Sequence, residues 1–249
     1  RILSAGAQNV IRQWDVATGD LRCEYIGHEA WVMSICALPD KRTFLSGSAD
    51  RTIRHWELGK ETELRYMIKH TQGIYGLQCF PDGEHFLSAS ADWSLKLWHL
   101  DSGKIVREFG LEHWAPEDDE HGHKIWVWAC LILDESRFAS AGHDGTCKIW
   151  NAWTGEHLHT LFVQEHMDNF KWNVRPPYRS LATYGPGKLV AACEDKTFKV
   201  WDYNTGEHEQ TYAGHAGAVW AVAVCGDKVV SGGGDSAIKV WAPSTMELE

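Results

Sequence analysis

Residues 27–56 of the chain, GHEAWVMSICALPDKRTFLSGSADRTIRHW, decide its fold. Apolar and polar side chains alternate through residues 31–38, 43–48 and 52–56, and short turn-forming segments separate these three runs. An alternation with a period of two is typical of β-strands that bury one face. Together with a fourth run at residues 63–68, the stretch predicts an antiparallel sheet of four short strands.

The same pattern recurs along the whole chain at intervals of about 40–50 residues, the period of four-stranded repeats. A tryptophan closes the third strand-like run of each unit, and the six are Trp14, Trp56, Trp98, Trp150, Trp201 and Trp241. An aspartate stands six residues before five of these tryptophans, and a serine stands ten residues before five of them. This regular spacing predicts an all-β chain whose sheets repeat and bury both faces against their neighbours.

The units also share their opening and closing residues. Gly-His opens several of them, as at Gly27-His28 and Gly214-His215, and Trp-Asp closes two, as at Trp201-Asp202. In these motifs the chain resembles the WD-repeat family over its whole length. The resemblance implies a WD-repeat β-propeller with six repeats visible, of which the first lacks its inner strand and the last is cut in its outer strand. We expect residues 1–249 to form a single β-propeller domain, a fragment of a longer chain whose ring has seven blades, with six as the alternative.

The resemblance further implies that His, Ser, Asp and Trp of one repeat form a hydrogen-bonded set. Four sets are complete: His28, Ser46, Asp50 and Trp56; His70, Ser88, Asp92 and Trp98; His123, Ser140, Asp144 and Trp150; His215, Ser231, Asp235 and Trp241. A Ser-His-Asp arrangement that recurs at fixed spacing is expected to be structural, because a catalytic triad is built once and exposed in a cleft. We therefore expect no catalytic residues. The fifth repeat has Ala191 in place of the serine, so Asp195 is expected to contribute less stability than Asp92.

The composition argues against several classes of protein. A hydrophobic fraction of 44% supports a packed core, and a net charge of −10 makes nucleic acid an unlikely partner. The seven cysteines stand singly, which indicates buried thiols and an intracellular protein of the cytoplasm or nucleus. No apolar run is long enough to cross a membrane. The acidic residues 117–123 are interpreted as a solvated loop, so neither a metal nor a cofactor is expected.

Two features indicate where a partner binds. The links near residues 111–121 and 164–177 carry extra residues, and insertions on one face of a repeat array usually mark its binding face. Large side chains follow the repeat histidines, where the resemblance implies that they surround the mouth of a central channel, as in the heterotrimeric G-protein β subunit. The expected partner-binding residues are Trp31, Met33, Tyr75, Trp93, Trp114, Trp126, Trp128, Trp172 and Trp220. The alternative is that some of them, Trp128 and Trp220 above all, pack between blades.

These observations lead to two hypotheses about function. The first is a non-catalytic scaffold or adaptor that binds a protein or peptide on the aromatic face of the propeller. The alternative is a regulatory or substrate-recognition subunit of a multi-protein enzyme complex, such as a ubiquitin ligase or kinase assembly. Other segments of the full-length chain are further expected partners. A catalytic propeller would need converging charged groups in its channel, and the aromatic mouth argues against it.

Overall fold

The structure is a computed structural model that describes residues 1–110, 122–163, 175–242 and 247–248. The chain divides into two compact units, Arg1–Gly122 and His123–Glu249, and each unit is described by itself. All regular structure in the described residues is β-strand, and none of these residues forms a helix that could cross a membrane. The single-domain organisation expected from the sequence remains a prediction.

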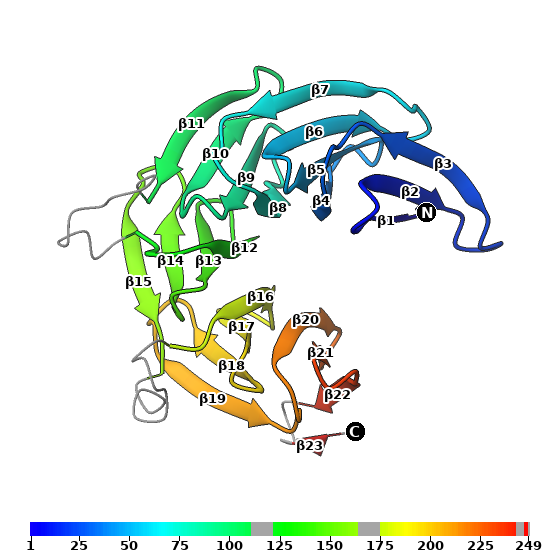
Figure 1. The fold of residues 1–249 in the computed structure, drawn as a ribbon. Coiled ribbons are helices and arrows are strands. Elements are labelled where there is room, and N and C mark those ends of the chain that lie inside the picture. The colour runs from blue at the N-terminus through cyan, green and yellow to red at the C-terminus, as the bar shows by residue number, and fades with distance from the viewer. Residues whose placement is uncertain (111–121, 164–174, 243–246, 249) are drawn as a thin grey trace. The chain divides into compact units, whose positions relative to one another are not determined.

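The first unit contains three antiparallel sheets, β1–β3, β4–β7 and β8–β11, and Figure 1 shows the strands of each sheet following one another in chain order. Its strands are β1 (Ile2–Ser4), β2 (Val10–Trp14), β3 (Leu21–Ile26), β4 (Val32–Ala37), β5 (Thr43–Ser48), β6 (Thr52–Glu57), β7 (Glu63–Ile68), β8 (Ile74–Cys79), β9 (His85–Ser90), β10 (Leu95–His99) and β11 (Lys104–Phe109). The four strands expected between residues 31 and 68 form within one residue of their predicted bounds.

The second unit contains three four-stranded sheets, β12–β15, β16–β19 and β20–β23. Its strands are β12 (Val127–Ile132), β13 (Arg137–Gly142), β14 (Cys147–Asn151), β15 (His157–Leu161), β16 (Tyr178–Thr183), β17 (Lys188–Cys193), β18 (Thr197–Asp202), β19 (His208–Ala213), β20 (Val219–Cys225), β21 (Lys228–Gly233), β22 (Ile238–Ala242) and β23 (Glu247–Leu248). The predicted all-β class and the repeating four-stranded sheet are confirmed in the described residues, with a three-stranded first sheet as expected.

Neighbouring sheets within a unit share an apolar core. In the first unit, Leu45 and Ile53 of one sheet pack in the same cluster as Phe86 and Trp98 of the next. The second strand of a sheet is buried on both faces: after its first residue, every residue of β5, β9, β13 and β17 is buried. Alternating side chains therefore reach two cores, one on each side of the sheet.

Hydrogen-bonded polar side chains connect the residue that precedes the inner strand with the second and third strands of the same sheet. In the sheet β8–β11, the Trp98 indole N–H donates to Ser88 Oγ at 2.8 Å, the Ser88 hydroxyl to His70 Nε2 at 2.7 Å, and His70 Nδ1 to Asp92 Oδ2 at 2.7 Å. The sets that contain Asp50, Asp144 and Asp235 make the same three contacts at 2.7–2.9 Å. All of these polar groups are satisfied, as buried polar groups must be if they are not to cost stability.

The aspartate also fixes the turn between the second and third strands. Asp92 Oδ2 accepts the backbone N–H of Thr71, and its Oδ1 accepts the backbone N–H and hydroxyl of Ser94. Burial alone would raise the pKa of the Asp92 carboxyl, but the hydrogen bonds from His70 and Ser94 outweigh burial and hold this pKa far below its usual range. The charged carboxylate thus stabilises the folded sheet.

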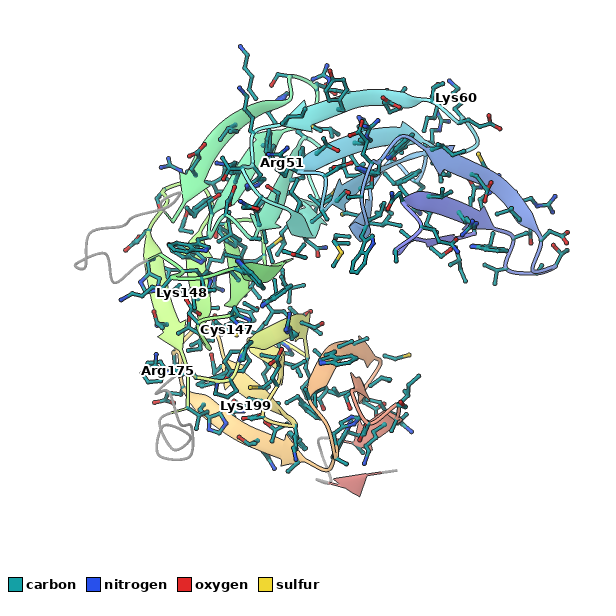
Figure 2. All side chains as sticks on the ribbon, in the orientation of Figure 1. Arg51, Lys60, Cys147, Lys148, Arg175 and Lys199 are labelled. Carbon is teal, nitrogen blue, oxygen red and sulfur yellow. The ribbon has the colours of Figure 1, made fainter. Side chains whose placement is uncertain are left out.

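The fifth repeat is joined differently. Ala191 occupies the serine position, and Trp201 Nε1, which is buried, has no hydrogen-bond partner among the described residues. Lys199 Nζ instead donates to Asp195 Oδ2 and, at 2.8 Å, to Thr197 Oγ1. The Lys199 side chain is only 1% exposed, and Figure 2 labels it on the ribbon of β18. Asp195 is therefore half of a buried ion pair, a role that the sequence-based expectation for this residue did not include.

We expect Asp195→Ala to destabilise the protein at least as much as Asp92→Ala, which reverses the order expected from the sequence. Removing Asp195 leaves the Lys199 ammonium buried without its anion, which costs about 3–5 kcal/mol, whereas losing the Asp92 hydrogen bonds costs about 1–3 kcal/mol. Urea denaturation of both variants measures the difference, with Asp101→Ala at an exposed turn as the control. A clearly smaller loss for Asp195→Ala would show that the ion pair contributes little.

We also expect acid to weaken the fold through these carboxyls. A carboxyl with a lowered folded pKa stabilises the protein above its unfolded pKa of about 3.9, and this contribution is lost as the pH falls below that value. Asp92→Asn removes one such group, so the variant should lose less additional stability than the wild type between about pH 5 and pH 2. Thermal melts across this pH range are the measurement. Parallel pH dependences for the two proteins would contradict the role given to the Asp92 charge.

Candidate functional site

A β-bulge lies at the same place in five of the six sheets. Where the inner strand begins, one extra residue stands between two successive pairs to the second strand, so that the register shifts. The five extra residues are Met33, Tyr75, Trp128, Arg179 and Trp220. Bulges re-aim a side chain and are common next to functional sites. At all five positions the chain places a large side chain.

Two further tryptophans stand two residues before a bulge. The Trp31 carbonyl accepts the backbone N–H of Ala49 at 2.9 Å, and the Trp126 carbonyl accepts that of His143 at 2.8 Å. These bonds fix the backbone, while the side chains of Trp31 and Trp126 remain 59% and 43% exposed. A large exposed apolar side chain on a fixed backbone loses little conformational entropy when a partner covers it.

In the second unit, the bulge residues Trp128 and Arg179 belong to a connected cluster. The rings of Trp126 and Trp128 meet edge to face with centroids 5.5 Å apart, and the Trp128 indole N–H donates to His143 Nδ1 at 3.2 Å. The Arg179 guanidinium lies 3.7 Å from the centre of the Trp128 ring, a cation–π contact. Arg179 Nε also donates to Glu194 Oε1 at 2.5 Å. We call these five residues the aromatic cluster.

The aromatic cluster is suited to binding rather than to chemistry. Burial and the positive charge of Arg179 lower the pKa of His143, which favours the neutral imidazole that accepts the Trp128 N–H. Arg179 is neutralised by Glu194 and covered on one side by Trp128. None of the five side chains is a nucleophile beside an activating base. The cluster therefore presents the exposed edge of Trp126 on a support already held in place.

The first unit carries its own set of expected partner-binding residues. Trp31 and Met33 are exposed at the start of β4, while Tyr75 at the start of β8 is half-buried. Trp93 is also half-buried, in the turn between β9 and β10. Of these four residues, only Trp31 and Met33 are therefore exposed to a partner.

Trp93 has an unusual backbone conformation. Its φ is 76°, in the left-handed region that bulky residues rarely adopt. The residues at the same place in the other sheets, Asn9, Arg51, Gly145, Lys196 and Ser236, have φ between 62° and 74°. The turn therefore imposes this conformation whatever the side chain, and a tryptophan in it is under backbone strain, as residues at binding sites often are.

Of the nine expected partner-binding residues, the structure describes seven, some exposed and some half-buried, and the half-buried ones are Tyr75, Trp93 and Trp128. Trp31, Met33, Trp126 and Trp220 are exposed, and Trp220 is 59% exposed although its ring also lies close to Gly234. Trp128 packs between the inner strands β12 and β16 against Arg179, which corresponds to the alternative weighed from the sequence. Trp114 and Trp172 lie outside the described residues.

Sequence reasoning missed Arg179, His143 and Glu194. Arg179 occupies the bulge position of the fifth repeat, whose opening histidine is absent from the expected place, so no motif marked the start of its inner strand. His143 and Glu194 follow the second strand at equivalent positions, where their backbone N–H groups bond to the Trp126 and Pro177 carbonyls. An alignment of the five turns that contain the repeat aspartate would have identified both His143 and Glu194.

No metal site emerges from the residues that the structure describes. In residues 1–110, 122–163, 175–242 and 247–248, no three His, Cys, Asp or Glu side chains are grouped as ligands. His123, at the end of the acidic stretch considered above, bonds to Ser140 and Asp144. The remaining acidic residues of that stretch, 117–120, lie outside the described part of the chain.

Comparison with known proteins agrees with the repeat seen in the structure. The family model described as "WD domain, G-beta repeat" matches residues 19–57, 62–99, 117–151 and 206–242, more than half of the chain. These are the four repeats with a complete His-Ser-Asp-Trp set. The sheet β16–β19 has the same topology, but Ala191 and the Asp195–Lys199 pair replace the usual set there.

Three curated proteins are each similar in sequence to about half of this chain. WD repeat-containing protein 41 of Mus musculus is 35% identical over 121 residues, covering 48% of this chain and 25% of the relative. Serine-threonine kinase receptor-associated protein of Homo sapiens is 28% identical over 128 residues, covering 50% and 34%. Ribosome biogenesis protein YTM1 of Coccidioides immitis is 26% identical over 133 residues, covering 50% and 27%. The matched segments thus span about a quarter to a third of the length of these relatives.

We expect Trp93→Gly to be more stable than Trp93→Ala by about 1 kcal/mol, because glycine adopts a positive φ without the clash that an L side chain meets there. Chemical denaturation of the two variants gives the difference. Gly145→Ala, at the same place in another turn, is the reverse control and should destabilise, since its Cβ would lie 2.1 Å from Arg175 Cβ. Equal stability of the two Trp93 variants would show that the turn relaxes out of the left-handed region.

Proposed function

Since this chain belongs to the WD-repeat family, we propose that it is a non-catalytic scaffold or adaptor that binds a protein or peptide partner. The binding residues lie where the inner strands of each unit begin. The observation that carries the proposal is the shared bulge, which places Met33, Tyr75, Trp128, Arg179 and Trp220 at equivalent positions of five sheets. A bulge re-aims the side chain that it carries, and all five of these side chains are large.

The exposed tryptophans are the anchors of the proposed site. Tryptophan and arginine are enriched among the residues that dominate interface energy, usually where rigid neighbours support them. Trp126 has such support from Trp128 and His143, and Trp128 in turn lies against Arg179. We therefore place the main contact of the second unit at Trp126 and that of the first unit at Trp31 and Met33.

The proposed partners and location follow from composition and chemistry. A net charge of −10 favours a protein or peptide over nucleic acid. All seven cysteines are thiols in the structure, which supports an intracellular location in the cytoplasm or nucleus.

The second candidate function is a regulatory or substrate-recognition subunit of an enzyme complex. Its support is the name of one relative, serine-threonine kinase receptor-associated protein, which matches half of this chain. Both hypotheses use the same tryptophans and differ in the partner. Co-purification of kinase or ubiquitin-ligase subunits at fixed stoichiometry would favour the second.

We expect Trp126→Ala and Trp31→Ala each to weaken partner binding by about 2 kcal/mol or more wherever the tryptophan lies in the contact, because anchors of this kind dominate interface energy. Partners captured from native cells by the wild-type protein are identified by mass spectrometry, and their affinity for each purified variant is measured by titration. Circular dichroism checks that both variants fold.

The matched controls are Glu84→Gln and Lys41→Ser, at exposed turns that follow the inner strands β8 and β4. These turns lie at the other end of the inner strands from the bulges, so the control variants should bind as tightly as the wild type. If a partner still binds both tryptophan variants but no longer binds the control variants, the binding site lies at the end of the inner strands opposite the bulges. That outcome would contradict the proposed site.

A further inference from the structure

Two cysteine side chains meet between neighbouring inner strands of the first unit. Cys36 lies on β4 and Cys79 on β8, 43 residues apart in the sequence, and their Sγ atoms are 2.9 Å apart. Two backbone groups fix the approach of these strands: the Leu77 N–H donates to Ser34 Oγ at 3.1 Å, and the Cys79 N–H donates to Cys36 Sγ at 3.1 Å. The two thiols are thus held together by the pairing of β4 with β8.

The fold does not require thiols at these positions. In the second unit, Ser180 and Val222 repeat the contact that Ser34 makes with Leu77, with the Val222 N–H donating to Ser180 Oγ at 3.3 Å. The position two residues after Ser180, which matches Cys36, is Ala182. Inner strands therefore pack side by side with an alanine in place of the cysteine, and the Cys36–Cys79 pair needs an explanation other than packing.

The environment of the pair favours reaction. A disulfide bond is about 2.05 Å long, so the sulfur atoms need to approach by only about 0.9 Å. The hydrogen bond from the Cys79 thiol lowers the pKa of Cys36. The Cys79 N–H lowers this pKa further, and the two together outweigh burial, which would raise it. Cys36 is 8% exposed, and Cys79 is more accessible, so a small oxidant can reach the pair at Cys79.

The buried thiols of the second unit provide the contrast. Cys147 and Cys193 are fully buried, and burial raises the pKa of Cys193 to about 12 and that of Cys147 well above its usual value. Thiols of this kind do not react as nucleophiles at neutral pH. Cys225 is exposed, with no second cysteine placed against it by any described contact.

We propose that Cys36 and Cys79 form a site of reversible oxidation, in which a hydroperoxide converts the two thiols into a disulfide between β4 and β8. The Cys36 thiolate attacks the outer peroxide oxygen, the O–O bond breaks, and Cys36 becomes a sulfenic acid while the alkoxide leaves and takes up the proton that Cys36 has lost. The Cys79 thiol then attacks the Cys36 sulfur, the S–S bond forms, the S–O bond breaks, and the hydroxide takes up the Cys79 proton and leaves as water. In sum, two thiols and one hydroperoxide give one disulfide, one alcohol and one water, with two electrons passing from the sulfurs to the peroxide.

The disulfide would join two sheets that are otherwise held by apolar packing and by the backbone contacts of β4 with β8. It would close a loop that contains the strands β5, β6 and β7, and closure of a loop of this size stabilises a protein mainly by restricting its unfolded state. Because cytosolic disulfides are usually transient, a thiol reductant would open this one again. Oxidation would therefore change the stability of the first unit reversibly.

The test is oxidation of the full chain with a small excess of hydrogen peroxide, followed by digestion without reduction and mass spectrometry. Trypsin alone leaves Cys23 and Cys36 in one peptide, so a Glu-specific protease that cuts after Glu24 and Glu29 is added to separate them. We expect a monomeric product with a peptide pair linked through Cys36 and Cys79, two hydrogens lighter than the sum of its parts and released by dithiothreitol. The Tm of the oxidised protein should rise and return to its first value after reduction.

The serine variants distinguish this site from general oxidation. Cys36→Ser and Cys79→Ser should each abolish the linked peptide and the Tm rise, while Cys225→Ser, which removes the exposed thiol, should keep both. Circular dichroism of the reduced variants checks their folding, and the wild-type peptide map stands independently of them. The proposal is overturned if Cys36 proceeds to a sulfinic acid with Cys79 still a thiol, if only other cysteines become linked, or if Cys225 is oxidised while the pair stays reduced.

Discussion

The hydrogen bond from a repeat histidine to a repeat aspartate is the contact on which the four sheets with a complete His-Ser-Asp-Trp set depend. The histidine precedes the inner strand, the aspartate stands in the turn between the second and third strands, and the serine and tryptophan belong to those two strands. One carboxylate thus fixes the entry of the inner strand, the turn and the third strand at once. Apolar packing between sheets supplies most of the favourable energy of folding, but packing alone is tolerant of register shifts, and this polar set is not.

The fifth repeat shows what happens when the set is incomplete. Without the serine, the Trp201 indole N–H has no acceptor in the described part of the chain, and an unsatisfied buried donor costs roughly 1–3 kcal/mol. Lys199 compensates by pairing with Asp195, because its position opposite Ala191 lets the ammonium reach the turn. The same register position holds Lys96 in the sheet β8–β11, where the lysine pairs outward with Glu108 instead. The same residue type at one register position thus has different partners, depending on whether a histidine already holds the aspartate.

The sequence was sufficient for the class of fold because both of its signals are local. Strand alternation needs a few consecutive residues, and the repeat needs only the spacing of Trp56, Trp98 and their equivalents. The binding residues were predicted less completely, because a bulge is a property of the pairing between two strands: Met33 and Tyr75 were found through their distance from a histidine, and Arg179 was missed where that histidine is absent. The Cys36–Cys79 contact was missed for a related reason. The two residues are not at equivalent repeat positions, since Cys36 pairs with Leu45 and Cys79 with Phe86, so aligning the repeats does not bring them together.

The turn between the second and third strands keeps one backbone shape with six different side chains at its left-handed residue, from Gly145 to Trp93. In the turns of Asp92, Asp144 and Asp195, side-chain hydrogen bonds join the aspartate before that residue to the Ser or Thr after it, so these bonds do not depend on the side chain between them. The residues that fix the turn are therefore different from the residue whose side chain varies between repeats. During evolution, the side chain at this position of one turn can therefore change at a cost of about 1 kcal/mol of backbone strain. The other repeats continue to hold the sheets in register.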